Sequence, residues 1–365
     1  MPETKKIAIV YDWIDKWGGV ERLLLTLHEM FPNAVFYTSY FDQQNASWAA
    51  GIKIKTSFLQ NFPAFIKKNR KLSFPFYPFA FENFDFKEYD LVISVTSSFA
   101  KSIITQPHTK HVCILLTPTR YFWLYPDEYF KSKIIKNVLL NHLKKWDIIA
   151  ANRPDKLISI SKTVAERSLK YYKKPSDVIY PPFDLKYWQG IKSKIKLLKP
   201  THDFYLIVSR LEPYKKINLA VEVFNTIKAK LIIVGAGSEL SKLKKMSGDN
   251  ITYLQHVSDE TLATLYTNAK ALLMPENEDF GYVSLEAQFF GTPVVALNRG
   301  GAKETVIDGK TGVLFDSQTK ADLMAALERF EQISYNLRAL IKETNAANVH
   351  RFDKKIFIDK LNSIL

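Results

Sequence analysis

Two successive series of alternating strand-like and helix-like segments constrain the fold of this chain more than any other feature. The clearest strand-like segments are residues 6–11, 34–39, 204–209 and 230–234, and the clearest amphipathic helical stretches are 20–30 and 219–227. Such alternation is typical of parallel sheets covered by helices. The sequence therefore predicts an α/β protein whose pattern begins twice.

The pattern restarts near residue 203, after the Pro181-Pro182 pair and a lysine-rich segment. A chain of 365 residues with 47% hydrophobic content can form two ordinary domains. Prolines and a charged stretch without periodicity favour a linker between them. We predict a first domain over residues 1–184, a linker over 185–202, a second domain over 203–345 and a C-terminal helical segment over 346–365.

Cysteine usage and hydropathy indicate a reduced, cytoplasmic setting. The single cysteine, Cys113, lies between apolar residues and is expected to be a buried strand thiol. The apolar run 7–11 is short and ends at Asp12, which excludes a signal peptide, and no later run is long enough to span a membrane.

The formal charge of +14 is confined to the first half of the chain. Residues 1–200 contain 31 Lys and Arg against 17 Asp and Glu, whereas residues 201–365 contain 20 of each kind. An uneven basic excess indicates an anionic partner, such as a phospholipid surface, a lipid-linked diphosphate or a nucleic acid. A solvated lysine-rich surface is the alternative.

Residues 58–86 combine ten Phe or Tyr residues with four nearby cations, Lys67, Lys68, Arg70 and Lys71. Three prolines interrupt any long helix, so an irregular amphipathic insertion is expected. Aromatic rings with lysines around them suit contact with an anionic membrane or a lipid acceptor. The same rings could instead pack the insertion onto its domain.

The most informative motif is PENEDFGYVSLEAQFFGTP at residues 275–293, where Glu278 and Glu286 are separated by seven residues. If Gly281 opens a helix, the free N–H groups and positive end of that helix form a diphosphate site. Glu278 would face a sugar, and Glu286 could accept hydrogen bonds from a ribose diol. Two glutamates on an exposed helix are the alternative interpretation.

This motif resembles the nucleotide-sugar motif of glycosyltransferase family 4, the group 1 glycosyltransferases with the GT-B fold. Residues 209–216, SRLEPYKK, resemble the family's Arg and Lys pair, which implies that Arg210 and Lys215 hold the donor diphosphate. The resemblance makes Arg210, Lys215 and Glu278 the expected catalytic residues. A guanidinium and an ammonium can neutralise charge on a departing nucleoside diphosphate.

Further matches extend the resemblance along nearly the whole chain. Residues 17–21, WGGVE, resemble the family's flexible glycine loop, which implies that Gly18 and Gly19 reach the donor phosphates. The segment 253–257 would line the base through its backbone at Val257. The resemblance also assigns donor binding to the residues of the motif itself, namely Asp279, Phe280, Gly281, Tyr282 and Glu286.

Residues 117–123, TPTRYFW, resemble the polysaccharide mannosyltransferase-like branch of the family. The resemblance implies an acceptor or sugar pocket that contains Thr117, Arg120 and Tyr121. This chain has Ser97 and Leu116 where relatives in that branch usually have histidines.

The resemblance implies two Rossmann-like domains facing a cleft, with the C-terminal helix returning to the first domain. It implies retaining transfer from a nucleotide-diphosphate sugar, GDP-mannose-like or a UDP-sugar, to a glycan or lipid-linked acceptor in polysaccharide or cell-envelope synthesis. No D-x-D triplet and no Cys/His cluster with zinc spacing occurs, so we expect no metal and no further cofactor. A peripheral position at the inner membrane face and no nucleic-acid partner are expected. A non-catalytic sugar-nucleotide-binding protein and a nucleotide-sugar epimerase are the alternatives.

Overall fold

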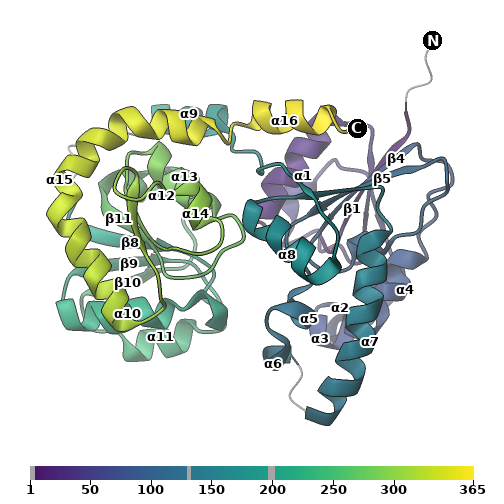
Figure 1. The fold of residues 1–365 in the computed structure, drawn as a ribbon, viewed down its shortest axis with the longest axis horizontal. Helices are drawn as coiled ribbons and strands as arrows, with labels where there is room; N and C mark the ends of the chain where they lie inside the picture. Colours follow the sequence, from purple (N-terminus) through teal and green to yellow (C-terminus); the bar gives the residue numbers. More distant parts are fainter. Residues whose placement is uncertain (1–4, 130–132, 196–201) are drawn as a thin grey trace. The chain divides into compact units, whose positions relative to one another are not determined.

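The computed structural model describes residues 5–129, 133–195 and 202–365. The chain forms two compact units (Figure 1). Unit 1 contains Met1–Pro181 and Ile358–Leu365, and unit 2 contains Pro182–Phe357. The chain thus leaves unit 1 once and ends in it again, because the last residues of helix α16 (Lys354–Asn362) belong to unit 1.

The segment expected as a linker differs from its prediction. Residues Leu185–Lys194 form helix α9 of unit 2, and the residues after 195 lie outside the described part until 202. Leu185, Trp188 and Ile191 recur every three residues and are buried, with the Trp188 ring centroid 5.7 Å from that of Phe290. One lysine, Lys186, lies between these positions and the other lysines of the segment follow Ile191, so the high lysine content concealed one apolar helix face.

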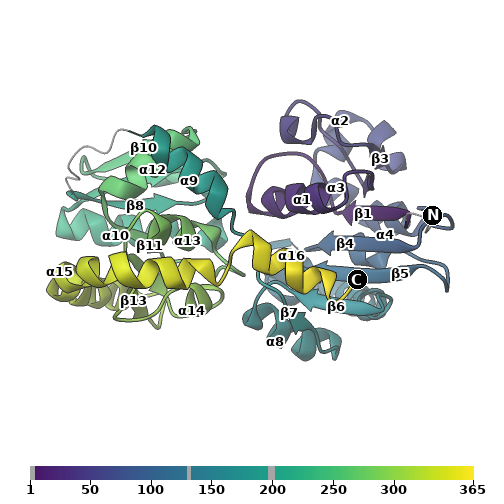
Figure 2. The ribbon, with the colours of Figure 1, turned by 90° about the horizontal axis from the view of Figure 1, so that it is seen from above.

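Unit 1 is built on a sheet whose described strands are all parallel, in the order β3-β2-β1-β4-β5-β6-β7 (Figure 2). The strands are β1 (Ile7–Tyr11), β2 (Val35–Thr38), β3 (Ile54–Thr56), β4 (Leu91–Thr96), β5 (Lys110–Leu115), β6 (Lys156–Ser159) and β7 (Asp177–Val178). Ala8, Ile9 and Val10 are all completely buried, so helices cover both faces of this sheet.

The described helices of unit 1 comprise three long ones and a group of very short ones. The long helices are α1 (Gly19–Met30), α7 (Lys133–Asn152) and α8 (Lys162–Tyr172), and the short ones are α2 (Ala64–Lys67), α3 (Arg70–Ser73), α4 (Tyr77–Glu82), α5 (Arg120–Trp123) and α6 (Pro126–Tyr129). Short 3-10 turns η2 (Phe58–Asn61) and η3 (Phe74–Phe76) accompany α2 to α4. Tyr77 and Phe81 of α4 and Leu140 of α7 pack on Ala8 and Val10 of β1 in one core cluster.

Unit 2 contains a second sheet of parallel strands, in the order β10-β9-β8-β11-β12-β13. The strands are β8 (Phe204–Val208), β9 (Lys230–Val234), β10 (Ile251–Leu254), β11 (Ala269–Met274), β12 (Val294–Leu297) and β13 (Gly312–Phe315). The helices besides α9 are α10 (Ile217–Ile227), α11 (Leu240–Met246), α12 (Asp259–Asn268), α13 (Tyr282–Phe289), α14 (Ala302–Thr305) and α15 (Lys320–His350).

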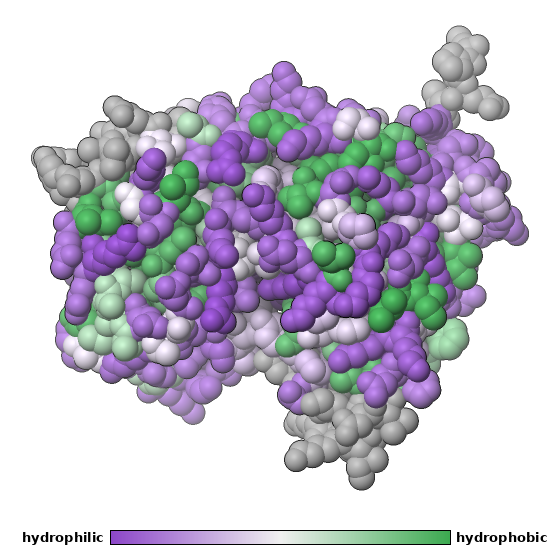
Figure 3. Space-filling model, in the orientation of Figure 1, coloured by the Kyte–Doolittle hydropathy of each residue, from purple (hydrophilic) through white to green (hydrophobic). Residues whose placement is uncertain are grey.

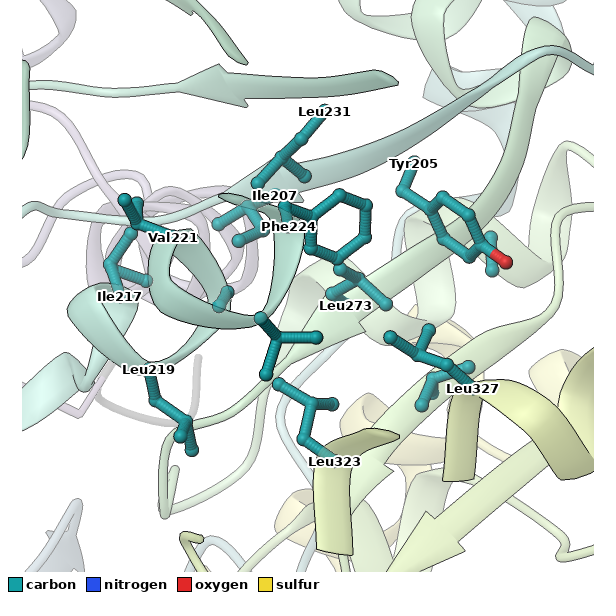
Figure 4. Close-up of a cluster of buried hydrophobic side chains, with 14 of the residues drawn as sticks. Tyr205, Ile207, Ile217, Leu219, Val221, Phe224, Leu231, Leu273, Leu323 and Leu327 are labelled. Carbon is teal, nitrogen blue, oxygen red and sulfur yellow. The ribbon is translucent and has the colours of Figure 1, made fainter. Parts of the chain in front are cut away.

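The core of unit 2 lies between the sheet and two helices. Figure 4 shows Val221 and Phe224 of α10 and Leu323 of α15 converging on Ile207 of β8 and Leu273 of β11. The residues 219–227 predicted as a helix supply this apolar face, with Leu219, Val223 and Phe224 at helical spacing. The predicted α/β class with two parallel-sheet units is confirmed.

Both sheets reverse their strand order at one place. In unit 1 the chain builds β2 and β3 on one side of β1 and then β4 on the other, and in unit 2 it does the same around β8 with β9 and β11. At such a reversal the loops after two neighbouring strands separate, and ligands of open α/β sheets bind there. The reversal points are therefore where a site is expected.

The face of the molecule drawn in Figure 3 is mixed in hydropathy. Figure 3 shows hydrophobic residues scattered among hydrophilic ones on the face that it views. Every helix within the described ranges falls short, in length or in apolar character, of what crossing a membrane requires.

Candidate active site

The loops that follow β8 and β11 bring two predicted catalytic residues together. After β8 the chain forms a short 3-10 turn, η5 (Pro213–Lys215), and after β11 it continues through Glu276 and Glu278. The Lys215 ammonium forms an ion pair with Glu278 and lies 3.7 Å from Glu276 Oε1. Lys215 and Glu276 are buried and Glu278 is partly buried. One ammonium is thus held by two carboxylates at the reversal point of unit 2.

Glu276 was missed by the sequence reasoning. Ser209 Oγ donates to its Oε1 at 3.4 Å, whereas its Oε2 is buried without a hydrogen-bond partner among the described residues. Burial raises the pKa of Glu276 above its usual range, and the attraction of Lys215 offsets this only in part. The neighbouring Asn277 also has a buried side-chain oxygen without a described partner. Such buried acceptors are uncommon in native proteins, and a water or a ligand can supply the missing donor.

Arg210 occupies the same loop as Lys215 but a different environment. Its side chain is exposed, and its Nη2 donates to the Tyr214 hydroxyl at 2.7 Å. The exposed guanidinium remains hydrated and can bind an anion through two N–H groups. This binding would break no buried ion pair. Arg210 therefore differs from Lys215, whose removal would leave two carboxylates without their buried cation.

Gly281 precedes helix α13, where the sequence predicted a helix to begin. It has φ +85°, and a Cβ built on it would lie 2.9 Å from Met274 Cε, so both conformation and space favour glycine. The first N–H groups of a helix lack intrahelical partners and carry the positive end of its dipole. The start of α13 therefore supports anion binding beside the Glu278 loop.

Glu286 lies inside α13 and is buried rather than exposed. The Tyr266 hydroxyl donates to Glu286 Oε2 at 2.8 Å. Glu278 lies in the loop before the helix. The alternative of two glutamates on one exposed helix face is therefore wrong, whereas the predicted contact of Glu286 with a ribose diol stays a prediction.

Of the other predicted donor-binding residues of unit 2, Phe280 and Asp279 are buried, whereas Val257 lies in a separate loop. Phe280 is buried, with its ring centroid 5.6 Å from that of Phe352 and 5.2 Å from that of Tyr282, and Asp279 is buried beside it. The Phe280 side chain thus anchors the loop. Val257 lies in the loop after β10, two strands away from β8, so the structure does not bring it to the Lys215 cluster.

Residues 275–281, here called the motif loop, pack against Gly300 and Gly301. Gly301 N donates to Glu278 O at 2.8 Å. A Cβ on Gly300 would lie 2.0 Å from Glu278 O, and one on Gly301 would lie 2.1 Å from Phe280 O. The two backbones therefore touch, and only glycine allows the approach.

The reversal point of unit 1 is organised by Asp12, which the sequence reasoning used only as the end of an apolar run. Asp12 is completely buried, and its carboxylate accepts hydrogen bonds from the backbone N–H groups of Ser97, Phe99 and Ala100, each at 2.8 Å. The Thr96 hydroxyl donates to it at 2.9 Å. Ser97, which the resemblance aligns with a histidine, is thus held through its backbone N–H and through its hydroxyl, which donates to Asp12 Oδ2 at 3.4 Å.

Gly18 and Gly19 lie between β1 and helix α1, at the same edge of unit 1. Gly19 is the first residue of α1, and Trp48 Nε1 donates to Lys16 O at 2.8 Å, which holds the loop. Trp17 in this loop is exposed and its ring centroid lies 6.3 Å from that of Trp48. The predicted contact of these glycines with donor phosphates remains untested by the described structure.

Thr117, Arg120 and Tyr121 lie on one segment after β5. Beneath the segment lies a fully buried ion pair, in which Lys101 Nζ is 2.7 Å from Asp147 Oδ1. The Thr119 hydroxyl also donates to Asp147 Oδ1, at 2.9 Å. The Tyr121 ring lies against Phe74 and Phe99, and burial raises the pKa of its hydroxyl. The structure keeps the three predicted pocket residues together, and their contact with a sugar stays a prediction.

No group of three or more His, Cys, Asp or Glu side chains within the described ranges could hold a metal ion. Cys113 is buried in β5 as expected, and burial raises the pKa of its thiol to about 11. This thiol is protonated at neutral pH and is a core residue.

Comparison with known proteins shows what this chain is similar to. Residues 189–347 match the family model described as glycosyl transferases group 1. The α-1,3/1,6-mannosyltransferase ALG2 of Dictyostelium discoideum is 23% identical over 295 residues, which cover 67% of this chain and 69% of that protein. Human ALG2 is 28% identical over 51% of each chain, and the capsular polysaccharide biosynthesis glycosyltransferase CapM of Staphylococcus aureus is 29% identical over 47% of this chain and 49% of CapM.

Solved structures show the same fold along the whole chain. Anabaena Alr3699/HepE, crystallised with UDP, superposes with a TM-score of 0.72 at 19% identity and covers 99% of this chain and 100% of its own. Sucrose-phosphate synthase from Thermosynechococcus elongatus gives a TM-score of 0.74 at 18% identity, over 99% and 98%. The predicted GT-B fold is confirmed.

The match of residues 189–347 to group 1 glycosyl transferases and the similarity to ALG2 support a glycosyltransferase, and the solved structures show its GT-B fold. The match to the group 1 glycosyl transferases covers less than half of the chain and lies within unit 2. The two ALG2 proteins support the predicted mannosyltransferase-like branch. The chain spans about half to two thirds of the length of these three relatives.

Proposed function

We propose that this protein transfers a sugar from a nucleotide-diphosphate sugar to a glycan or lipid-linked acceptor with retention of anomeric configuration. The observation that carries the proposal is the Lys215 cluster, in which one buried ammonium lies between Glu276 and Glu278 at the reversal point of unit 2. The HepE structure holds UDP, which supports a nucleoside diphosphate as the ligand of this fold.

The leaving diphosphate would meet its charge partners in the loop after β8 and at the start of α13. Arg210 is exposed and available for bidentate contact, Lys215 is close by on η5, and Gly281 opens the helix. Cations and helix dipoles aimed at a developing negative charge contribute most to such reactions. Because the sequence supplies these cations and lacks a D-x-D triplet, we expect transfer without a metal.

A diphosphate that approaches this cluster also approaches two carboxylates. Glu278 is paired with Lys215, and Glu276 has a raised pKa because it is buried. A proton on Glu276 would relieve the repulsion, and the protonated carboxyl group would keep an acceptor oxygen for a sugar hydroxyl. We therefore expect the donor to bind most tightly when Glu276 is protonated.

The donor sugar would be oriented by acceptor atoms that have no partner in the described chain. The buried oxygens Glu276 Oε2 and Asn277 Oδ1 can accept hydrogen bonds from sugar hydroxyls. Glu278 is engaged by an ammonium, which lowers its strength as a nucleophile. A front-face reaction, in which the leaving oxygen helps deprotonate the acceptor hydroxyl, uses position and electrostatics alone.

The acceptor is proposed from the relatives and from the charge of the chain. CapM acts in capsular polysaccharide biosynthesis, and a basic first half suits a lipid-linked diphosphate acceptor. We place the reaction in polysaccharide or cell-envelope glycan synthesis, on the cytoplasmic side and at the inner face of the membrane. A non-catalytic sugar-nucleotide-binding protein is the second candidate, motivated by Ser97 and Leu116 at the positions of the branch histidines.

The proposal is tested with the purified protein and a panel of UDP- and GDP-sugars. We expect one donor to raise the melting temperature and to be hydrolysed slowly without acceptor. Lys215→Ala should lower this turnover by about 10²–10³-fold, whereas the exposed neighbour Lys216→Ala should change it by less than about twofold. Lys215→Ala should also melt earlier, because two carboxylates lose their buried cation.

Three outcomes would contradict the proposal. Donor binding without any turnover, with or without acceptor glycans, would favour the binding protein. Interconversion of two free nucleotide sugars would reveal an epimerase. Equal turnover of the Lys215 and Lys216 variants would remove the cluster from the reaction.

A further inference from the structure

Residues 58–79 of unit 1, here called the aromatic insertion, expose an unusual share of apolar side chains. The described residues include 13 exposed large hydrophobic side chains, and five of them lie in these 22 residues. They are Phe58, Phe65, Leu72, Phe76 and Phe79. Single exposed apolar residues are ordinary, but a concentrated group indicates an interaction surface.

The exposure is not the result of loose attachment. In α4 the residues Tyr77, Ala80 and Phe81 are buried in the core cluster of unit 1, and Leu59 of η2 belongs to the same cluster. Phe79 lies two residues after Tyr77, on the opposite side of the helix, and is 60% exposed. One side of the insertion is therefore fixed to the core while the other presents apolar groups to solvent.

Ring contacts and a hydrogen bond connect the parts of the insertion. The Phe62 ring centroid lies 5.7 Å from that of Phe58 and 5.1 Å from that of Phe76. Ser73 Oγ donates to Ile66 O at 2.7 Å, which joins α3 to α2. Both ribbon views place α2 and α3 side by side (Figures 1 and 2). The exposed rings thus belong to one continuous structure.

The charge of the insertion and of its unit is positive. Between residues 58 and 79 the chain has four cations and no Asp or Glu, and unit 1 has 27 Lys and Arg against 17 Asp and Glu. Arg70 pairs with Asp15 at 2.8 Å and Lys68 with Asp42 at 3.3 Å, which neutralises part of the local excess. Lys68 nevertheless remains more than half exposed, and Lys71 is exposed.

We propose that the aromatic insertion docks unit 1 onto an anionic lipid bilayer. Phe65 and Phe79 would enter the boundary between headgroups and acyl chains, while Lys68 and Lys71 would lie near lipid phosphates. Aromatic rings with basic residues beside them are suited to this boundary, and the basic unit draws the protein to an anionic surface. The docking requires neither donor nor acceptor, so it stands or fails separately from sugar transfer.

The test measures co-sedimentation of the full chain with vesicles at low salt. Parent protein should bind vesicles that contain phosphatidylglycerol and phosphatidylcholine, bind phosphatidylcholine vesicles weakly, and leave the anionic vesicles as salt rises. Phe65→Ser with Phe79→Ser should weaken binding by about 100-fold, from about tenfold for each buried ring. A matched pair, Ile149→Ser with Leu169→Ser, removes apolar groups of similar exposure (60% and 56%) outside the insertion and should bind like the parent.

Melting curves check that both pairs fold, which the exposure of the four side chains favours. If the Phe pair does not fold, Lys71→Glu is the second probe and should lower binding to anionic vesicles only. The proposal is overturned if the parent does not bind anionic vesicles at low salt, if salt has no effect, or if both pairs lose binding equally. A dimer that the Phe pair dissociates, with no vesicle binding by the parent, would instead assign the surface to a second copy of the chain.

Discussion

Units 1 and 2 reverse their strand order in the same way, but the buried carboxylates at the two reversal points have different partners. In unit 1 the carboxylate of Asp12 accepts three backbone N–H groups and a hydroxyl, so its charge is fully engaged within the chain. In unit 2 Lys215 is shared by two carboxylates, and Glu276 Oε2 has no described partner. We call the point around Asp12 closed and the point around Glu276 unsatisfied, although Asp15 Oδ1 in the loop after β1 also lacks a described partner. Ligands of such sheets bind at reversal points, and the ion-paired cluster around Glu276 favours unit 2.

The largest expected effect tests the unsatisfied point through Arg210. Arg210→Ala should lower sugar transfer or donor hydrolysis by about 10²–10³-fold, because an exposed guanidinium would stabilise the leaving diphosphate without a role in packing. Its melting temperature should match the parent, since the exposed Arg210 side chain donates to the Tyr214 hydroxyl and is not part of the core. Steady-state rates with the best donor provide the measurement, with Lys216→Ala as control. Unchanged turnover would remove Arg210 from the site.

The next effect tests the closed point through Asp12. Asp12→Asn should lower the free energy of unfolding by about 3 kcal/mol, because the amide nitrogen cannot accept the backbone N–H groups and leaves buried donors unpaired. Urea denaturation provides the value. Asp90→Asn, at an exposed carboxylate that accepts Lys6 N at 2.7 Å, should cost far less. If Asp12→Asn is as stable as the control, the reversal point of unit 1 is not locked as described.

The smallest effect sharpens the contrast through the pH dependence of Glu276. Its pKa is raised in the folded protein, so the parent loses stability as pH rises through that folded pKa. Glu276→Gln does not titrate, so its stability relative to the parent should increase from pH 4 to pH 8. The expected increase is about 1 kcal/mol, which corresponds to about 2 to 4 °C in melting temperature. The exposed Glu222→Gln should show no such trend. A difference that is constant with pH would mean that Glu276 does not titrate in this range.

Much of the fold could be predicted because periodicity reports burial directly. The strands β1, β2, β8 and β9 and helices α1 and α10 lie within two residues of the predicted segments. Helix α9 was taken for a linker because lysines dominate the segment from residue 186 to 199, and a short helix that follows two prolines has few periods to detect. Charge composition therefore outweighed a weak apolar pattern.

The candidate site could be predicted in part. The meeting of Lys215 and Glu278 follows from parallel strands whose carboxyl ends share one edge. Glu276 and Asp12 were missed because spacing shows neither which carboxylate is buried nor which has all its hydrogen bonds made. Phe280 shows the reverse: it belongs to the motif, yet its side chain packs against Phe352. The roles of Arg210, Lys215 and Glu278 in transfer stay predictions.

The backbone contact between the motif loop and residues 300 and 301 has a consequence for how this protein tolerates change. A single added methyl group at Gly300 or Gly301 would lie about 2 Å from a carbonyl oxygen of the loop that bears Glu278. A mutational scan scored by growth or activity should therefore find these two positions as intolerant as the charged residues. Intolerance at Gly300 and Gly301 would then report contact with the backbone of this loop and not contact with the donor.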